Sequence, residues 1–365
     1  MGAQRKVVRT EPPLAERLKQ RIASDGPISV EAYMQACLAD PDAGYYATRH
    51  PIGKDGDFVT APEVSQIFGE LVGLCAAAIW QSMGAPKAVV VAELGPGRGT
   101  LMADALRAWQ SVSGLLDAVS VVLVETSPAL RAMQKTRLDG APVTLRWSER
   151  IEDLPQGPLI LIANEFLDAL PVRQLVRREG AWRERVVALG PDRGFIFAEG
   201  NPVDWVQDAP DGSIFETRPG VETLVSALAA RAAHAPVAAL LIDYGHDTPG
   251  FGDTLQAVRR HACADLLAAQ GEADLTAHVD FAALKRTAEA VGLTPYGPMP
   301  QGAFLLKLGL EARRDRLLQR ATQAQREAIL SGAARLVDPR QMGLLFKALA
   351  LTSAGLAPPP PFGEN

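Results

Sequence analysis

The stretch from residue 88 to residue 100 constrains the fold of this chain more than any other. It begins with the apolar run Ala-Val-Val-Val-Ala and continues as Glu93-Leu94-Gly95-Pro96-Gly97-Arg98-Gly99-Thr100. A run rich in β-branched residues is typical of a strand buried on both faces, as found in parallel sheets that helices cover. Helical spacing follows at Leu101, Ala105 and Trp109. The stretch therefore predicts a strand, a glycine loop and a helix.

The alternation of strands and helices continues after residue 100. We expect strands at 120–125, 143–146, 159–163 and 238–243, with a helix at 127–138. Alternating strands and helices predict a parallel sheet with helices on both faces. The sequence thus predicts an α/β fold with a doubly wound, Rossmann-like sheet.

The remaining segments suggest how the chain is divided. We expect an N-terminal part with helices and a covering loop at 1–84, a sheet core at 85–169 and 236–310, a β-rich and helical insertion at 170–235, and C-terminal helices with a tail at 311–365. A strand pair is expected at 293–298 and 303–309, and helix over 311–352. We expect the Gly-, Pro- and Asp-rich loop at 44–63, together with the insertion, to cover the ligand site and to shape a substrate channel, because an insertion after the fourth strand lies above the carboxyl edge of the sheet.

The composition argues against several classes of protein, including nucleic-acid-binding, metal-binding and membrane-spanning proteins. The 365 residues are 47% hydrophobic, which is enough for a sizeable core, and the formal net charge of −5 gives no global attraction to nucleic acid. Three cysteines without C-x-x-C spacing and five scattered histidines give no metal site and favour a reducing compartment, the cytoplasm. No apolar run approaches the ~18 residues that a membrane-spanning helix needs.

The glycine loop carries the strongest functional signal. Gly95, Gly97 and Gly99 would let the backbone approach a ligand, and Thr100 opens a helix whose free N–H groups face it. The loop lacks the lysine of a Walker A motif, and threonine replaces the third glycine of the dinucleotide fingerprint. Glu93 would repel a pyrophosphate but suit an ammonium. S-adenosylmethionine carries an ammonium, a sulfonium and no phosphate, so we predict it as the cofactor, with a nicotinamide-dependent oxidoreductase as the weaker alternative.

Polar residues at the ends of the next strands complete a candidate cofactor site. Glu125 ends the second strand, where an acid accepts hydrogen bonds from ribose hydroxyls in doubly wound sheets. Trp147 and Ser148 follow the third strand, and Asn164 follows the fourth. These residues are expected to border the adenine, although Trp147 equally fits a packed core aromatic.

Four residues are candidates for catalysis. Glu165 and Asp168 follow the fourth strand within one turn, where they could bind a cationic substrate or accept its proton. Capping of the next helix is the competing interpretation. Asp243 and His246 end the strand at 238–243 and are the second choice, because a lone histidine is more often a hydrogen-bonded structural residue.

Several motifs together resemble the MidA family of class I S-adenosylmethionine-dependent methyltransferases. The similarity spans roughly residues 25–352 in order. It rests on GDFVTAPEVSQIFGE at 56–70, ELGPGRGT at 93–100, NEFLDALPV at 164–172, IDYGH at 242–246, DLTAHVDF at 274–281 and QGAFL at 301–305.

The resemblance implies more than the residues do. It implies a class I methyltransferase sheet, S-adenosylmethionine as cofactor and a protein substrate. Mitochondrial members form symmetric dimethylarginine on a core subunit of respiratory complex I and assist its assembly. A non-catalytic, cofactor-binding assembly factor is the alternative, and a homodimer is left open. Asn164-Glu165-Phe166 replaces the Asn/Asp-Pro-Pro-Tyr motif of many amino-group methyltransferases, so their catalytic scheme does not transfer.

Overall fold

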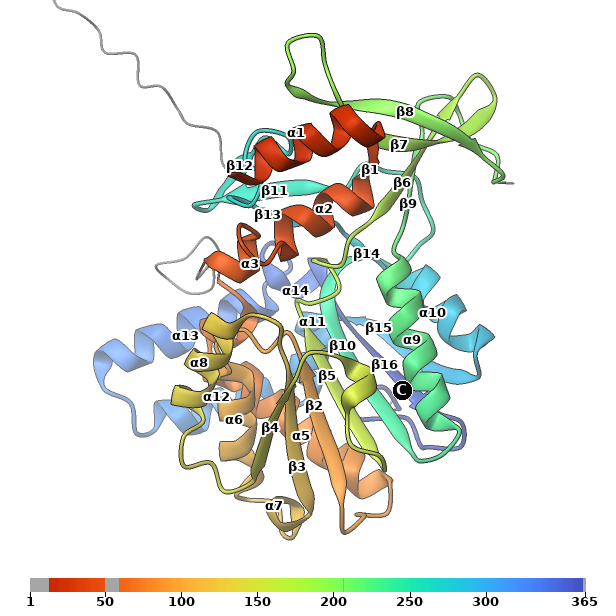
Figure 1. The fold of residues 1–365 in the computed structure, drawn as a ribbon. Coiled ribbons are helices and arrows are strands. Elements are labelled where there is room, and N and C mark those ends of the chain that lie inside the picture. Colours follow the sequence, from red (N-terminus) through yellow and green to blue (C-terminus); the bar gives the residue numbers. More distant parts are fainter. Residues whose placement is uncertain (1–12, 50–58, 206, 364–365) are drawn as a thin grey trace, which may run out of the picture. The chain divides into compact units, whose positions relative to one another are not determined.

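The computed structural model describes residues 13–49, 59–205 and 207–363, which form two compact units (Figure 1). The first unit takes its described residues from 1–49, 171–217 and 251–276. The second takes them from 50–170, 218–250 and 277–365. Of the segment 170–235, residues 171–217 belong to the first unit and residues 218–235 to the second, and the functional division predicted from the sequence stays a prediction.

The second unit contains an eight-stranded sheet. Its strands lie in the order β15-β16-β10-β5-β2-β3-β4, and β14 pairs with β10. Their bounds are β2 Val89–Leu94, β3 Val119–Val124, β4 Thr144–Ser148, β5 Leu159–Asn164, β10 Val237–His246, β14 Val279–Asp280, β15 Leu293–Pro300 and β16 Phe346–Ser353. Strands β10, β5, β2, β3 and β4 pair in parallel, whereas β16 is antiparallel to both neighbours. The predicted α/β fold with a mostly parallel sheet is confirmed.

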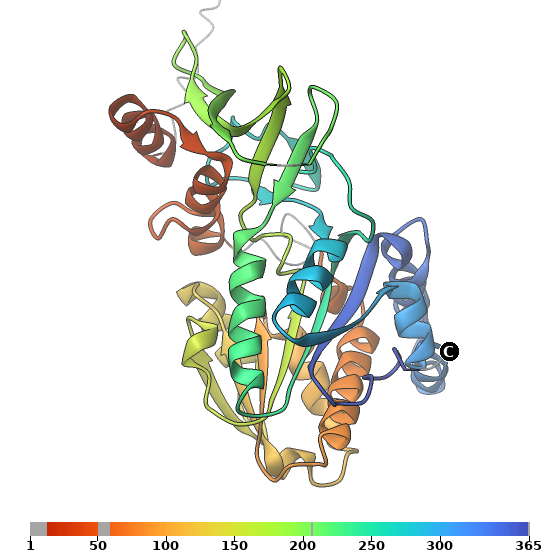
Figure 2. The same cartoon turned by 90° about the vertical axis from the view of Figure 1, so that its right-hand side faces the viewer.

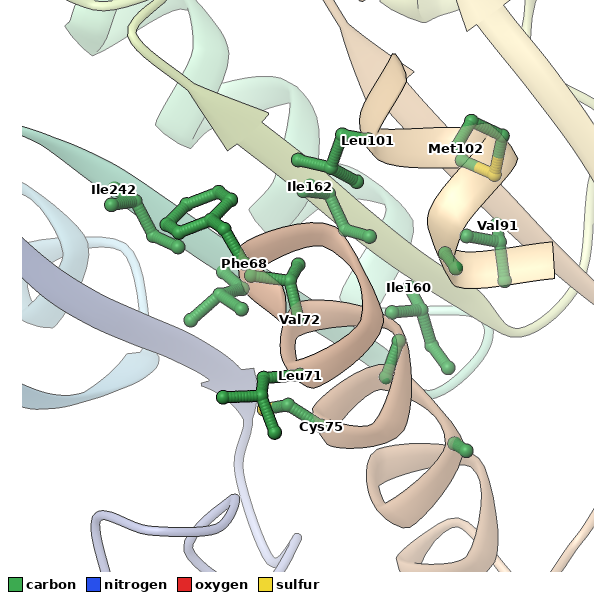
Figure 3. Packing of buried hydrophobic residues seen from close by; sticks show 14 of the residues in the cluster. Phe68, Leu71, Val72, Cys75, Val91, Leu101, Met102, Ile160, Ile162 and Ile242 are labelled. Atoms are coloured by element: carbon green, nitrogen blue, oxygen red, sulfur yellow. The ribbon is translucent and has the colours of Figure 1, made fainter. Parts of the chain in front are cut away.

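Helices cover both faces of this sheet (Figure 2). They are α4 Ala61–Val64, α5 Gln66–Ser82, α6 Thr100–Trp109, α7 Leu115–Ala118, α8 Pro128–Arg137, η1 Ile151–Asp153, α9 Pro219–Ala232, α10 Phe281–Ala290, α11 Gln301–Lys307, α12 Leu310–Leu318, α13 Gln323–Val337 and α14 Met342–Leu345. Val91 and Ile160 face α5 and α6, as Figure 3 shows, whereas the alternate residues Ala92 and Leu161 pack with α9 and α10. Burial on both faces explains why these strands are almost continuously apolar.

Two glycines allow α5 and α6 to pack closely. A Cβ added at Gly69 would lie 2.7 Å from the Cβ of Asp104. One added at Gly73 would lie 2.6 Å from the Cα of Ala105. The indole N–H of Trp109 donates a 2.7 Å hydrogen bond to the carbonyl of Gly73, which fixes the contact further. The glycines are thus required by the close approach of the helix that follows the glycine loop.

We expect Gly73→Val to destabilise the protein by about 3 kcal/mol, because its side chain would overlap the backbone of α6. The free energy of unfolding, measured by urea denaturation, tests this. Leu74→Val is the matched control: it places the same β-branched residue one position away, where the side chain is 39% exposed, and should cost less than about 1 kcal/mol. Equal losses in the two variants would contradict the role assigned to Gly73.

The end of the chain differs from the sequence prediction in two places. The predicted strand pair 293–298 with 303–309 is wrong, because residues 301–307 form α11 and β15 pairs with β16 instead. The predicted helix over 311–352 is wrong at its end, where β16 lies between β10 and β15. Leucine and alanine favour helix, but the burial of Ala348–Leu351 within the sheet outweighs that local preference.

The proline-rich tail packs against the helices of the second unit. The thiol of Cys75 donates a 3.1 Å hydrogen bond to the carbonyl of Pro360. The ring of Phe362 lies 5.7 Å from that of Phe304, between centroids. One aromatic residue, Phe362, thus anchors the proline-rich segment to the core.

The first unit combines N-terminal helices with two small sheets. Its elements are α1 Pro13–Asp25, β1 Ile28–Ser29, α2 Val30–Ala39, α3 Tyr45–Thr48, β6 Arg173–Arg178, β7 Ala181–Leu189, β8 Phe195–Val203, β9 Ile214–Thr217, β11 Gln256–Arg259, β12 Ala262–Ala264 and β13 Asp274–Thr276. One sheet has the order β1-β7-β6-β9 with β8 on β7, and all its pairs are antiparallel. The part of the segment 170–235 that was expected to be β-rich contains β6, β7, β8 and β9, whereas the sheet β12-β11-β13 was not anticipated.

The covering role expected for the loop 44–63 and the insertion stays a prediction. Residues 50–58 of that loop lie outside the described part of the chain. Among the described residues, no helix combines the length and apolar character needed to cross a membrane.

Candidate active site

The order of the strands places a candidate site at the carboxyl ends of β2 and β5. From β2 the chain proceeds outward to β3 and β4, and from β5 it proceeds to β10 on the other side. In open α/β sheets, ligands bind outside the carboxyl ends of the strands at such a change of direction. The residues singled out from the sequence lie in the last residues of β2, β3, β4, β5 and β10 or in the segments that follow these strands. They are Glu93, Gly95, Gly97, Gly99, Thr100, Glu125, Trp147, Ser148, Asn164, Glu165, Asp168, Asp243 and His246.

The three glycines of the loop after β2 are all in the left-handed region. Gly95, Gly97 and Gly99 have φ values of +57°, +51° and +77°. A side chain is disfavoured in this conformation, and a Cβ at Gly95 would lie 2.8 Å from the ring of Phe166. Gly99 is the N-cap of α6, so the loop leads directly into the helix N-terminus.

A buried glutamine that the sequence analysis missed connects the loop to the next two strands. The side-chain amide of Gln134 donates to the carbonyl of Gly97 (2.8 Å) and to Oε2 of Glu125 (3.3 Å). Its oxygen accepts a 2.9 Å hydrogen bond from the indole of Trp147. Leu130, Gln134 and Leu138 fall at i, i+4 and i+8, so a glutamine on the apolar face of α8 is the signal that could have revealed it.

Glu125 is mostly buried at the end of β3. Its Oε1 accepts a 2.8 Å hydrogen bond from the backbone N–H of Ser127, and burial raises the pKa of its carboxyl group. Trp147 is partly buried against the core, and Lys135 Nζ lies 5.5 Å from its ring centroid. The hydroxyl of Ser148 donates to the carbonyl of Arg150 at 2.9 Å. The ribose and adenine roles of these residues remain predictions.

Two neighbouring strands bring buried hydrogen-bond acceptors to the same edge. Glu93 at the end of β2 is 3% exposed, and burial, with the charge of Glu125, raises its pKa to about 8. Within the described residues, Oε2 of Glu93 and Oδ1 of Asn164 have no hydrogen-bond partner. Because buried acceptors usually find donors, this edge suits a ligand that supplies N–H or O–H groups.

The turn after β5 holds the first pair of catalytic candidates. Glu165 has φ +49°, an uncommon conformation for a residue with a side chain. Its Oε1 accepts hydrogen bonds from the N–H of Ala61 (2.7 Å) and the amide of Asn164 (3.2 Å), and burial raises its pKa to about 7. Asp168 is 6% exposed; burial raises its pKa, whereas a hydrogen bond from Tyr244 and the charge of Arg218 act against that rise. Its Oδ1 has no partner among the described residues.

Asp243 holds this turn in place. Its Oδ2 accepts hydrogen bonds from the backbone N–H groups of Phe166, Leu167 and Asp168 at 3.1, 2.8 and 3.2 Å. Its Oδ1 accepts a 2.9 Å hydrogen bond from the N–H of Tyr244. Burial, then the charge of Asp168, raises the pKa of Asp243 well above its usual value. Both oxygens of Asp243 are bound to backbone N–H groups, so this residue positions the turn, and the catalytic role expected from the sequence stays a prediction.

His246 lies at the end of β10, as predicted. Its Nδ1 is 2.8 Å from the carbonyl of Thr248 and 3.9 Å from Oδ1 of Asp280. One ring nitrogen is therefore engaged locally, and a role as base stays a prediction. In the described ranges, no group of three or more His, Cys, Asp or Glu side chains could hold a metal ion.

The residues of this edge fit S-adenosylmethionine. The glycines let the ligand approach the protein backbone, and Glu125 after β3 is an acid of the kind that binds ribose hydroxyls. The unpartnered Oε2 of Glu93 can accept hydrogen bonds from the ammonium group. Bound there, this cofactor would supply an electrophilic methyl group. Glu93 would hold the ammonium, while Gly95, Gly97 and Gly99 would leave room for the ligand beside the backbone.

The raised pKa of Glu93 predicts a pH dependence of cofactor binding. Below about pH 8 the unliganded carboxyl group is mostly protonated, and an ammonium partner favours the ionised form. The affinity for S-adenosylhomocysteine should therefore rise about tenfold between pH 6.5 and 8.5. Isothermal titration calorimetry across this range measures it. Glu93→Gln should remove the dependence, and methylthioadenosine, which lacks the ammonium, should not show it; a flat profile for the original protein would contradict the placement.

Comparisons with known proteins match this chain to methyltransferases over most of its length. A family model described as "Putative S-adenosyl-L-methionine-dependent methyltransferase" matches residues 71–299. The chain is 38% identical to "Protein arginine methyltransferase NDUFAF7 homolog, mitochondrial" of Drosophila melanogaster, over 94% of this chain and 86% of that one. It is 35% identical to "Protein arginine methyltransferase NDUFAF7, mitochondrial" of Homo sapiens, over 93% of this chain and 83% of that one.

A solved structure is also similar over nearly the whole chain. It is a crystal structure of a COG1565 superfamily member from Burkholderia thailandensis bound to S-adenosyl-homocysteine. The TM-score is 0.80 at 28% sequence identity, and the match covers 94% of this chain and 92% of that one.

Proposed function

This chain belongs to the MidA family of S-adenosylmethionine-dependent methyltransferases, and from that premise we propose that it methylates arginine side chains of a protein substrate. The names of the relatives support an arginine substrate. The observation that carries the proposal is the turn after β5, which presents two carboxyl groups, the half-buried Glu165 and the buried Asp168, beside the predicted cofactor loop.

The acceptors of this turn match a guanidinium group. Oδ1 of Asp168 and Oδ1 of Asn164 are buried acceptors without donors among the described residues. A planar guanidinium offers five N–H donors in fixed directions, and carboxylates accept such donors in pairs. Binding an arginine would therefore satisfy oxygens that otherwise stay unpaired and would orient one nitrogen toward the methyl donor.

The reaction needs orientation and removal of one proton. Attack of a guanidinium nitrogen forms the new N–C bond as the S–C bond breaks, and the electron pair of that bond stays on sulfur. The methylated nitrogen then gives up its proton. Glu165, with a pKa near 7, can accept a proton close to neutral pH, while Asp168 holds the guanidinium. Asp243 contributes by fixing the backbone of residues 166–168.

The finer identity of the substrate belongs to the same proposal. The family resemblance suggests symmetric dimethylation of an arginine on a core subunit of respiratory complex I, and a part in the assembly of that complex. We propose the cytoplasm as the compartment, on the composition of the chain alone; cell fractionation tests this.

Formation of S-adenosylhomocysteine tests the activity. The purified protein is incubated with S-adenosylmethionine and the candidate subunit, and mass spectrometry locates methylated arginine. A subunit with the target arginine replaced by lysine is the control and should give no product. Cofactor binding without turnover on any subunit offered would contradict the proposal and favour a non-catalytic assembly factor. A parallel NADH titration tests the oxidoreductase alternative.

A further inference from the structure

The short helix α4 is fixed beside the glycine loop by contacts on several sides. The N–H of Ala61 donates to Oε1 of Glu165 at 2.7 Å, and the side chain of Ala61 is fully buried. A Cβ added at Gly332 in α13 would lie 2.9 Å from the carbonyl of Val64, so α13 packs closely against the other end of α4. These contacts determine where the side chain of Glu63, between Ala61 and Val64, is directed.

The carboxylate of Glu63 lies at the N-terminus of α6. Its Oε1 accepts a short hydrogen bond from the hydroxyl of Thr100, the first residue of that helix. Its Oε2 lies 3.5 Å from Nη1 of Arg98, and the Glu63 side chain is 15% exposed. Nε of Arg98 is buried and has no hydrogen-bond partner among the described residues. Glu63 thus pairs with the cation and the helix terminus that the glycine loop presents.

This position has a known use in other doubly wound sheets. After the first strand, a pyrophosphate binds at the N-terminus of the helix because the free N–H groups and the helix dipole attract negative charge. Here the carboxylate of Glu63 in α4 occupies the place of that negative charge at the N-terminus of α6. Thr100 stands where the dinucleotide fingerprint has its third glycine, and its hydroxyl is the group that holds Glu63.

We propose that Glu63 is a specificity-determining residue that excludes phosphate-bearing nucleotides from the glycine loop. Its charge neutralises Arg98 and repels a pyrophosphate, while a phosphate-free, cationic ligand such as S-adenosylmethionine meets no such repulsion. This inference rests on the cofactor part of the proposed function and deepens it, because it explains how a dinucleotide-like sheet avoids the abundant nucleotides NADH and ATP.

The test measures two ligands in parallel by calorimetry at low and high salt. Glu63→Gln removes the charge and should strengthen binding of inorganic pyrophosphate and of NADH about tenfold or more, relative to S-adenosylhomocysteine. The gain should weaken with salt, and should disappear in Glu63→Gln/Arg98→Gln, because Arg98 provides the attraction. Asp117→Asn is the matched control: it makes the same change of charge at an exposed position of α7, which leads into the opposite end of β3.

The outcomes separate this inference from the cofactor assignment. Absence of S-adenosylhomocysteine binding in the original protein would refute the cofactor site whatever pyrophosphate does. Unchanged pyrophosphate and NADH affinity in a folded Glu63→Gln protein, or an equal gain in Asp117→Asn, would overturn the role of Glu63. Should Glu63→Gln fail to fold, Thr100→Val, which removes the hydroxyl that holds Glu63, should shift selectivity in the same direction, and no shift there would also overturn it.

Discussion

Gly97→Val is expected to leave no measurable binding of S-adenosylhomocysteine. Gly97 has φ +51°, a conformation that a β-branched residue rarely adopts, and its carbonyl is bound to the amide of Gln134. The valine side chain would both strain the loop and occupy space that the ligand needs beside the backbone. Isothermal titration calorimetry measures the loss directly.

A control must distinguish the effect of backbone strain in Gly97→Val from the effect of filling the ligand site. Gly84→Val is the matched control, because Gly84 has φ +84°, no atom lies within 4 Å of its added Cβ, and it is exposed between α5 and β2. This variant suffers comparable backbone strain but should bind the ligand as the original protein does. Unchanged affinity in a folded Gly97→Val protein would refute the placement of the ligand over the loop.

Glu165→Gln and Asp168→Asn are each expected to lower turnover by about 10²-fold or more, while cofactor affinity changes only a few-fold. Both substitutions keep the shape of the side chain. The first removes a group that can accept a proton near neutral pH, and the second removes a charge that would hold the guanidinium. Single-turnover rates of S-adenosylhomocysteine formation, with separate calorimetry for the cofactor, measure the two effects independently.

The same pair of measurements also distinguishes the competing roles. Full turnover in both variants would remove these acids from the mechanism. Loss of cofactor binding alone in Glu165→Gln would move Glu165 to the cofactor site. Asp117→Asn again serves as the control for a change of charge elsewhere, and it should retain both turnover and affinity.

Strands with a strong local signal were predictable from the sequence. The runs at 88–92, 120–124 and 159–163 are rich in β-branched or large apolar residues because both faces of those strands are buried. The strand β16 was not predictable, because its Leu-Ala pattern favours helix and becomes a strand only between β10 and β15. Segment 301–307 was predicted as a strand, yet it forms α11.

The sequence alone indicates which residues lie at the candidate site, but it does not indicate which of them are in contact. Strand ends and glycines identify Glu93, Glu125 and Glu165 from the sequence, because their positions follow from the topology of the sheet. The hydrogen bonds of Asp243 to the turn depend on how two strand ends meet in space. The same holds for the contact of Glu63 with Thr100, which joins α4 to α6 across 37 positions of sequence.

The place of β16 in the sheet has a consequence for biosynthesis. This strand comes late in the sequence, at Phe346–Ser353, yet it lies between β10 and β15 and pairs with both along most of its length. Until β16 has been synthesised, the backbone N–H and C=O groups of β10 and β15 that pair with it have no partner strand. Such unpaired strand edges are prone to association with other chains. We therefore expect the nascent polypeptide to depend on chaperones until β16 has left the ribosome, and truncations that remove Phe346–Ser353 to yield aggregates.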